Sequence, residues 1–329
     1  MGKINFKPLF YQLLVQNKNG SAFLLPATKI VWKTQRTGRA GSLEFDFVGG
    51  DKFCGVAVSL SCGDVVRLEV EGELLFYGYL FSMERSGKET FSATAYDQTR
   101  YLMASDTYVF TGATAAEIIR RIGGDFGIRL GNVAETGYRI PAFSRDNEKL
   151  LDVMNAALAE TTNNTGKKYV LYDKEGALTL DPLEKMRLGI ALGDPDMATG
   201  FSYAESIDDG TYNKIKLVQN DKKSGIRSVY IYKNNASIAR WGLLQYYEPV
   251  DTKYNAAMIR QRGETLLALK NRMQKTFRLS ARGDVSCRAG MAVYVELSDL
   301  GAAQFYVIES AKHTFEGNDY SMNLMMKAV

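Results

Sequence analysis

Residues 63–81 read Gly-Asp-Val-Val-Arg-Leu-Glu-Val-Glu-Gly-Glu-Leu-Leu-Phe-Tyr-Gly-Tyr-Leu-Phe, and this stretch decides the fold class of the N-terminal third of the chain. Within 65–70, aliphatic and charged residues alternate with the period of a half-buried β-strand. The turn Glu71-Gly72-Glu73 then reverses the chain, and residues 74–81 return through Gly78 as a second strand. The stretch therefore predicts a β-hairpin.

The same pattern extends outward from this hairpin. Leu43, Phe45 and Phe47 alternate with acidic residues, and a later turn leads into a strand over residues 90–96. Short strands, tight turns and little helical periodicity over about 100 residues are typical of a small β-barrel or sandwich. We therefore predict a first β-barrel domain over residues 1–104.

Helical periodicity begins after residue 107. Thr114 and Glu117 have the spacing of a capping box ahead of a helix that should end at Gly123-Gly124. An apolar stripe predicts a second helix from Asp146 to about Thr162, and a hairpin should follow over residues 169–180. Residues 105–203 are therefore predicted to form a small α+β domain.

Strands resume in the last third of the chain. We expect strands at 214–219 and 228–232, a turn at Asn234-Asn235 that leads to a third strand, and three closing strands at 292–297, 304–314 and 320–327. An amphipathic helix over about 255–275 interrupts them. The predicted fold is mainly β with an α+β insertion, in which a second β-barrel domain over residues 204–329 contains the inserted helix.

The helix at 255–275 has one strongly basic face, on which Glu264 is the only acid. This pattern fits a solvated helix face, and it also fits a surface for an acidic partner or for passing nucleic acid. The five cations predicted as interface residues are Arg260, Arg262, Lys270, Arg272 and Lys275.

Two distant segments share a local pattern. Gly63 and Gly290 are each followed by valine three residues on, by an aliphatic residue five residues on, and later by an aromatic pair, Phe76-Tyr77 or Phe305-Tyr306. The similarity suggests that the two β regions are versions of one barrel.

Residues for catalysis or metal binding are scarce. His313 is the only histidine and falls inside a predicted strand, so a structural role is favoured over a catalytic one. Cys54, Cys62 and Cys287 lack the spacing of a metal site or a disulfide framework. We therefore predict no metal, no cofactor and no enzymatic activity.

Pairs of acidic residues are the remaining chemical candidates, and solvated charge is the favoured interpretation of each. The pairs are Glu44 with Asp46, Glu71 with Glu73, and Asp208 with Asp209. A cell-wall enzyme that uses Glu44, Asp46 or Asp51 is kept as an alternative. A second alternative is a peptidoglycan-binding module within residues 105–200.

Overall composition excludes several classes of protein. The 41 basic and 37 acidic residues leave a net charge of +4 over 329 residues, which is too small to indicate specific nucleic-acid binding. No signal peptide is evident, and no segment reaches the ~18 unbroken apolar residues of a membrane span. We expect no membrane insertion and synthesis in the cytoplasm.

Several motifs resemble those of XkdQ-like hub proteins of contractile phage tails and phage-tail-like bacteriocins. The most specific is the run Tyr96-Asp97-Gln98-Thr99-Arg100-Tyr101-Leu102. The other matching segments are 63–66, 75–80, 106–110, 114–119, 169–180, 206–208, 212–215 and the terminal region from Gly290.

This resemblance implies a structural baseplate hub in the virion or tail-like particle, assembled in the bacterial cytoplasm. It implies a homotrimer in which each subunit supplies two tube-like barrels, so that a pseudo-sixfold ring joins a hexameric tail tube protein to a trimeric central spike protein. Other baseplate or tape-measure proteins are further expected partners. Some related hubs carry a lysozyme or peptidase domain, but this chain ends with the last predicted strand, so wall cutting is expected of another protein.

Overall fold

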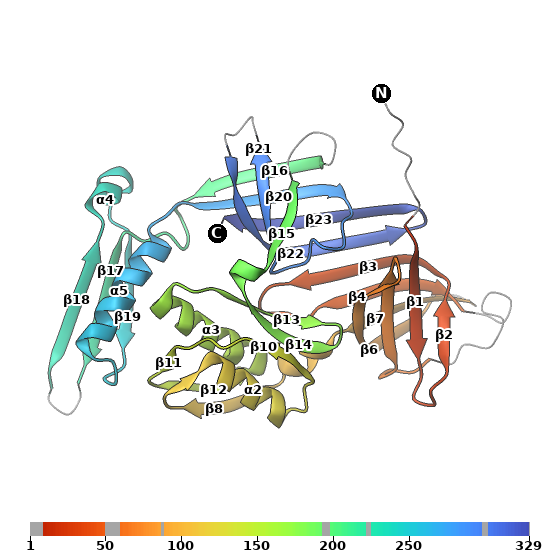
Figure 1. Ribbon diagram of the computed structural model, residues 1–329, viewed down its shortest axis with the longest axis horizontal. Helices are drawn as coiled ribbons and strands as arrows, with labels where there is room; N and C mark the ends of the chain where they lie inside the picture. Colours follow the sequence, from red (N-terminus) through yellow and green to blue (C-terminus); the bar gives the residue numbers. More distant parts are fainter. Residues whose placement is uncertain are drawn as a thin grey trace.

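The computed structural model describes residues 9–49, 60–86, 89–192, 198–221, 225–297 and 302–328. The molecule is elongated, and its parts follow one another along the long axis (Figure 1). A first β region lies at one end, a second β region and an α+β region lie in the middle, and a small unit of strands and helices lies at the other end. The predicted fold class, mainly β with an α+β insertion, is confirmed.

The first β region is an antiparallel ladder. Its strands pair in the order β3-β4-β7-β6-β5-β1-β2, and the predicted alternation puts Leu43, Phe45 and Phe47 in its core. The strands are β1 (Tyr11–Gln16), β2 (Ala22–Leu25), β3 (Ala27–Gln35), β4 (Ser42–Val48), β5 (Val65–Val70), β6 (Glu73–Arg85) and β7 (Thr90–Tyr96).

The second β region continues the same sheet. Its path runs β16-β20-β23-β22, and β22 also pairs with β21, which in turn pairs with β15. The far half of β22 pairs with β3, so the described strands of both regions form one 13-stranded sheet. The strands are β15 (Arg187–Leu192), β16 (Ala198–Ser206), β20 (Gln274–Arg282), β21 (Ala292–Leu297), β22 (Ala302–Glu316) and β23 (Asp319–Ala328).

The α+β region packs two helices on short strands. Thr114 and Glu117 form the predicted capping box of α2. The predicted start of the next helix at Asp146 is wrong, because residues 143–149 pair with β8 and α3 begins at Leu150. The elements are η1 (Gln98–Met103), β8 (Ser105–Phe110), β9 (Ala113–Thr114), α2 (Ala115–Asp125), β10 (Leu130–Val133), β11 (Arg139–Ile140), β12 (Phe143–Lys149), α3 (Leu150–Thr165), β13 (Tyr169–Lys174), β14 (Ala177–Pro182) and η2 (Leu183–Lys185).

Between β16 and β20 the chain forms a separate unit, which we call the insertion unit. Its sheet, in the order β18-β17-β19, is covered on one face by α5 and has its own core, which includes Ile215, Leu217 and Leu266. The predicted inserted helix is therefore only one part of a larger inserted unit. The elements are β17 (Lys214–Asn220), β18 (Arg227–Lys233), α4 (Asn235–Trp241), β19 (Gln245–Val250) and α5 (Ala256–Lys270).

Two further predictions in this part of the chain are wrong. The turn at Asn234-Asn235 leads into α4 instead of a strand, because the Asn234 side chain accepts a hydrogen bond from the Ser237 amide and caps the helix. The helix predicted to reach Lys275 ends at Lys270, since Lys275 pairs with Glu205 inside the sheet as part of β20.

The two β regions repeat one strand order, which confirms the suggested duplication. The pairings among β3, β4, β5, β6 and β7 recur among β16, β20, β21, β22 and β23. Gly63 and Gly290 have φ of 94° and 92°, and their amides donate to Leu80 O and Ile308 O at 2.7 and 2.8 Å. An irregularity in the pairing follows at Leu80/Ser82 in one repeat and at Ile308/Ser310 in the other.

The aromatic pairs are not part of this equivalence. Val66, three residues after the first glycine, faces Gly78, whereas Val293 in the second repeat faces Tyr306. Phe76-Tyr77 and Phe305-Tyr306 therefore occupy different positions in their repeats.

Candidate assembly interface

The joint between the two repeats is a strand pairing within the chain. β22 pairs with β3 from Ser310↔Gln35 to Glu316↔Lys29. The joint extends one residue further, because the Arg36 amide donates to Glu309 O at 2.9 Å. Two guanidinium nitrogens of Arg36 also lie 3.0 Å from the Glu309 carboxylate oxygens, a bidentate geometry. One repeat thus binds the next by extending a sheet.

The strand edges equivalent to this joint are unused in the described residues. Counting from the shared irregularity, Ser82 of β6 corresponds to Ser310, and Ser206 of β16 corresponds to Gln35. Residues 82–84 pair with β7 alone, and β16 pairs with β20 alone, within the part of the chain that the structure describes. These two edges therefore match the two sides of the internal joint and lie at separate places in the chain.

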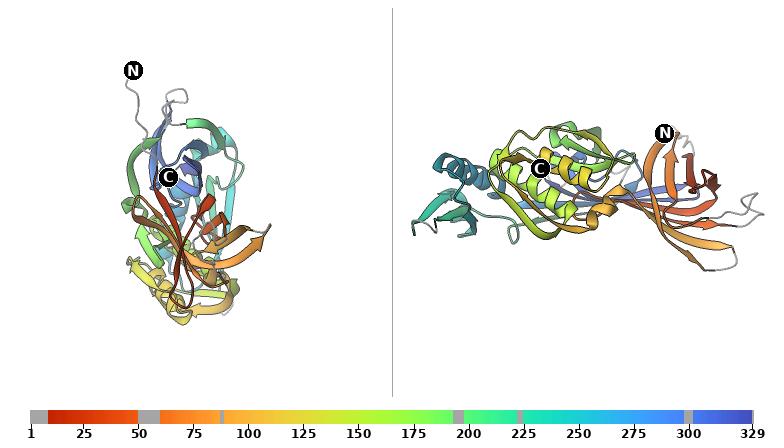
Figure 2. Two further views of the ribbon diagram at one scale, coloured as in Figure 1. Left: turned by 90° about the vertical axis from the view of Figure 1, so that its right-hand side faces the viewer. Right: turned by 90° about the horizontal axis from the view of Figure 1, so that it is seen from below.

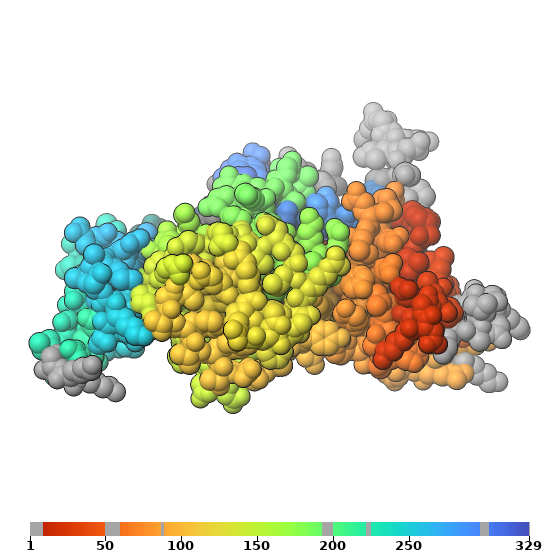
Figure 3. Space-filling model, turned by 60° about the horizontal axis from the view of Figure 1, so that its bottom comes forward, coloured from red at the N-terminus to blue at the C-terminus, as the bar shows by residue number. Residues whose placement is uncertain are grey.

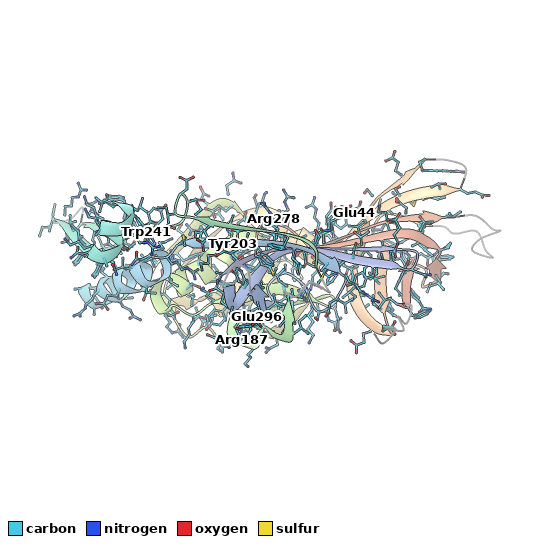
Figure 4. The ribbon with its side chains drawn as sticks, turned by 90° about the horizontal axis from the view of Figure 1, so that it is seen from above. Glu44, Arg187, Tyr203, Trp241, Arg278 and Glu296 are labelled. Atoms are coloured by element: carbon cyan, nitrogen blue, oxygen red, sulfur yellow. The ribbon has the colours of Figure 1, made fainter. Side chains whose placement is uncertain are left out.

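One face of the long sheet is polar and hollowed across the joint. The hollow measures about 1090 Å³, and its lining includes Lys33, Glu44, Arg278 and Lys312. The Lys33 amino group lies 2.5 Å from the Glu44 carboxylate. Figure 4 shows Glu44 and Arg278 on the same side of this sheet. Such a face can border water and needs no third layer to cover it.

The five predicted interface cations do not form one exposed face. Arg260 is exposed and pairs with Glu264 at 2.9 Å, and Lys275 lies 3.5 Å from Glu205. Lys270 and Arg272 are half-buried, and the Lys270 amino group lies 4.6 Å from the Tyr246 ring centroid. An interface role for these four stays a prediction.

Arg262 is buried and binds within the chain, so its predicted place on an exposed face is wrong. Its guanidinium lies 2.9 Å from Glu160 of α3 and 2.6 Å from Glu248 of β19, and its side chain is 4% exposed. Burial alone would lower the pKa of Arg262, but the two carboxylates raise it above its usual value. This cluster fastens the insertion unit to the α+β region. The apolar spacing of the helix could not reveal it, because the partners come from distant segments.

The run 96–102 holds the first β region to the α+β region. Buried Asp97 accepts hydrogen bonds from the amides of Thr99 and Gly41. The Gln98 side chain exchanges hydrogen bonds with both backbone groups of Arg129 at 3.0 Å and donates to Asp173. Burial, and then the nearby Asp173, raise the pKa of Asp97 to about 7. The run 96–102, the most specific motif of the family resemblance, therefore has a structural role between these two regions.

His313 is a core residue, which agrees with the structural role predicted for it. Its Nε2 donates to Cys287 O at 3.1 Å, and the Tyr320 hydroxyl donates to Nδ1 at 2.9 Å. These partners fix a neutral imidazole, and burial lowers its pKa from 6.5 to about 4.

The pKa of His313 predicts a loss of stability in mild acid. The unfolded chain takes up a proton on this residue below about pH 6.5, whereas the folded chain resists protonation until about pH 4. Stability from this residue is therefore complete above pH 6.5 and falls by about 3 kcal/mol as the pH drops to 4. Over the same pH range, the free energy of unfolding of His313→Gln, measured in urea, should fall by about 3 kcal/mol less than that of the unsubstituted protein. Parallel pH profiles for the two proteins would contradict this account.

The first of the predicted acidic pairs, Glu44 with Asp46, is bound by neighbouring side chains. Glu44 pairs with Lys33, and Asp46 accepts a hydrogen bond from the Ser92 hydroxyl at 2.6 Å. Asp51 and Cys54 lie outside the described residues. Among the residues that are described, no group of three or more His, Cys, Asp or Glu side chains is placed to hold a metal ion. No helix in the described ranges is long and apolar enough to cross a bilayer.

Comparison with known proteins identifies the family of this chain. The model of the YqbQ-like family matches residues 30–327. The chain belongs to this family. It is 33% identical over 271 residues to "Uncharacterized protein YqbQ" of Bacillus subtilis strain 168, which is 81% of each chain. It is 32% identical over 273 residues to "Phage-like element PBSX protein XkdQ" of the same strain, covering 81% of this chain and 82% of the relative. The XkdQ-like resemblance is thereby confirmed.

Solved structures share the fold of this YqbQ-like chain at low sequence identity. The 43 kDa tail protein of prophage MuSo2 from Shewanella oneidensis superposes with a TM-score of 0.68 at 15% identity, covering 96% of this chain and 98% of that one. The E. coli c3393 protein, described as a component of the type VI secretion system, gives a TM-score of 0.59 at 10% identity, covering 96% and 76%. The fold is therefore that of phage tail proteins and their secretion-system counterparts.

Proposed function

We propose that this YqbQ-like protein is a structural hub in the baseplate of a contractile phage tail or tail-like particle. Its relative XkdQ belongs to a phage-like element, and its fold is shared with prophage tail proteins. The observation that carries the proposal is the duplicated β region, in which one repeat already binds the other edge to edge.

The proposed assembly is a homotrimer closed by repeating the internal joint between copies. β6 of one copy pairs with β16 of the next, so each copy uses two different edges, as in other head-to-tail rings. Three copies with two repeats each give six similar positions around the ring. Such a ring fits a sixfold tail tube protein on one side and a threefold central spike protein on the other.

The repeat sets the register of the proposed joint. Ser82 faces Ser206 of the next copy, and Glu84 faces Ala204. Phe81 and Ile207 take the places of Glu309 and Arg36, so an apolar contact replaces the internal ion pair. Main-chain hydrogen bonds between strand edges supply affinity in such contacts, and side chains supply specificity.

The hub has a non-enzymatic role in this proposal. Tail tube, spike and other baseplate or tape-measure proteins are its partners, and assembly takes place in the bacterial cytoplasm before the particle is released. Large complementary surfaces, and not a pocket, bind these partners. Cell-wall cutting belongs to another component of the particle.

Copy number and native mass test this function. We expect three copies of the chain in each purified particle. The chain alone should form a species near 3 × 36.6 = 109.8 kDa, and the complex with the spike protein should exceed this by the mass of the spike. Absence from purified particles, together with a monomeric mass in the presence of the spike protein, would overturn the proposal.

A further inference from the structure

We propose that the insertion unit docks an acidic surface of a different protein in the particle through the uncovered face of its sheet. This face is separate from the strand edges that form the proposed ring. The inference rests on the proposed function only in placing the chain in a particle, which the copy number tests independently.

The two faces of this sheet differ in what covers them. α5 lies so close to one face that a Cβ at Gly263 would come within 2.1 Å of the Tyr232 ring. The opposite face, which we call the outer face, has no covering element in the described residues. Residues paired across neighbouring strands share a face. The outer face consists of Lys214, Lys216, Val218, Asn220, Arg227, Val229, Ile231, Lys233, Gln245, Tyr247 and Pro249.

The centre of the outer face is apolar. Val218 is fully buried between its strand partners Val229 and Pro249. Around it, Val229, Ile231 and Tyr247 are 47%, 53% and 49% exposed. Single exposed apolar side chains are common, but a contiguous exposed group with a polar rim is typical of an interaction surface.

The outer face is also strongly basic. It carries Lys214, Lys216, Arg227 and Lys233 and no carboxylate. None of these four cations forms an ion pair with any residue that the structure describes, although the Lys216 amino group lies 5.8 Å from the Tyr247 ring centroid. Glu248 of β19 pairs with Leu217 on the opposite face and binds Arg262, and Asp221 and Asp251 follow the ends of β17 and β19. The face therefore complements an acidic surface.

The positive charge and the apolar centre of the outer face together favour a protein surface as its partner. A second copy would bring four cations against four cations, which costs free energy when charges are desolvated. A nucleic-acid backbone would satisfy the cations but would leave Val229 and Ile231 without apolar partners. An acidic protein surface with an apolar centre satisfies both features.

The position of the unit suits this role. It stands at the end of the molecule opposite the first β region, away from the long sheet (Figures 1 and 2). The space-filling view also shows it as a projecting end (Figure 3). The Arg262 cluster fixes it to α3, so the outer face is held in a defined orientation.

Photocrosslinking in assembled particles tests the proposal. Benzoylphenylalanine is placed at Ile231 in the full chain, and a matched control is placed at Val109, a 70% exposed valine on β8. We expect position 231 to crosslink to another particle protein within a peptide rich in Asp or Glu. We expect the charge reversal Lys216→Glu with Lys233→Glu to reduce this crosslink at least tenfold.

The remaining outcomes contradict the proposal. They are a crosslink from position 231 to a second copy of the chain, a crosslink to nucleic acid alone, and no crosslink in particles that contain the chain. An undiminished crosslink after charge reversal also contradicts it. Unchanged amide exchange in α5 shows that the reversed variant keeps its fold.

Discussion

Replacing Arg262 by alanine should lower the free energy of opening of the insertion unit by about 3 to 5 kcal/mol, because two carboxylates lose their shared partner in a buried place. Glu160 and Glu248 are only 24% and 16% exposed, and both contact this one guanidinium. Hydrogen exchange of the α5 amides measures the effect directly. Faster exchange should be concentrated in α5 and the adjoining part of α3.

Arg260 supplies a matched control on the same helix. It also pairs with a glutamate, Glu264, but its side chain is 76% exposed and the pair is solvated. Arg260→Ala should therefore change the same free energy by about 0.5 kcal/mol or less. Equal effects of the two substitutions would contradict the role assigned to Arg262.

Cysteines at Ser82 and Ser206 should join neighbouring subunits into a covalent trimer. The equivalent residues Ser310 and Gln35 face each other across the internal joint, and directly opposed strand residues have Cβ atoms about 4.5 to 5.5 Å apart. That spacing is close enough for a disulfide after a small adjustment. Under oxidation we expect most of the chain to run near 3 × 36.6 = 109.8 kDa on a non-reducing gel and to return to monomer with reductant.

The control shifts the register by four residues. Ser82→Cys with Ser202→Cys keeps both substitutions conservative but separates the thiols by about 13 Å along the strand. Both pairs are placed in a chain whose Cys54 and Cys62 are replaced by serine, while buried Cys287 is kept. Equal crosslinking of the two pairs, or none for either in assembled particles, would contradict the proposed joint.

Much of the fold could be predicted from local patterns. Alternation at 43–47 and 65–70 reports one buried face, so the strands and their core residues follow directly. The spacing of Thr114 and Glu117 marks the start of α2, because both capping partners are local. The repeated glycines mark the duplication, since both adopt the positive φ that favours this residue.

The features that local patterns could not predict depend on distant partners. The helical pattern of 255–270 and the strands near 214–219 and 228–232 are evident in the sequence. The packing of the helix on these strands as a separate unit is not, so the sequence assigns the strands to the second β domain and predicts only an inserted helix. Arg262 looks like its exposed neighbours in sequence, and only its contacts with Glu160 of α3 and Glu248 of β19 distinguish it. The strand edges of the candidate interface show no distinctive side-chain pattern in the sequence, because backbone groups make such contacts.

A cryo-EM reconstruction of the baseplate at side-chain resolution tests the central claim most directly. We predict three copies of the chain in a closed ring, with residues 82–84 of each copy paired to β16 of the next in the register that places Ser82 opposite Ser206. A reconstruction in which β6 and β16 face other proteins, or in which the copies do not close on one another, would contradict it.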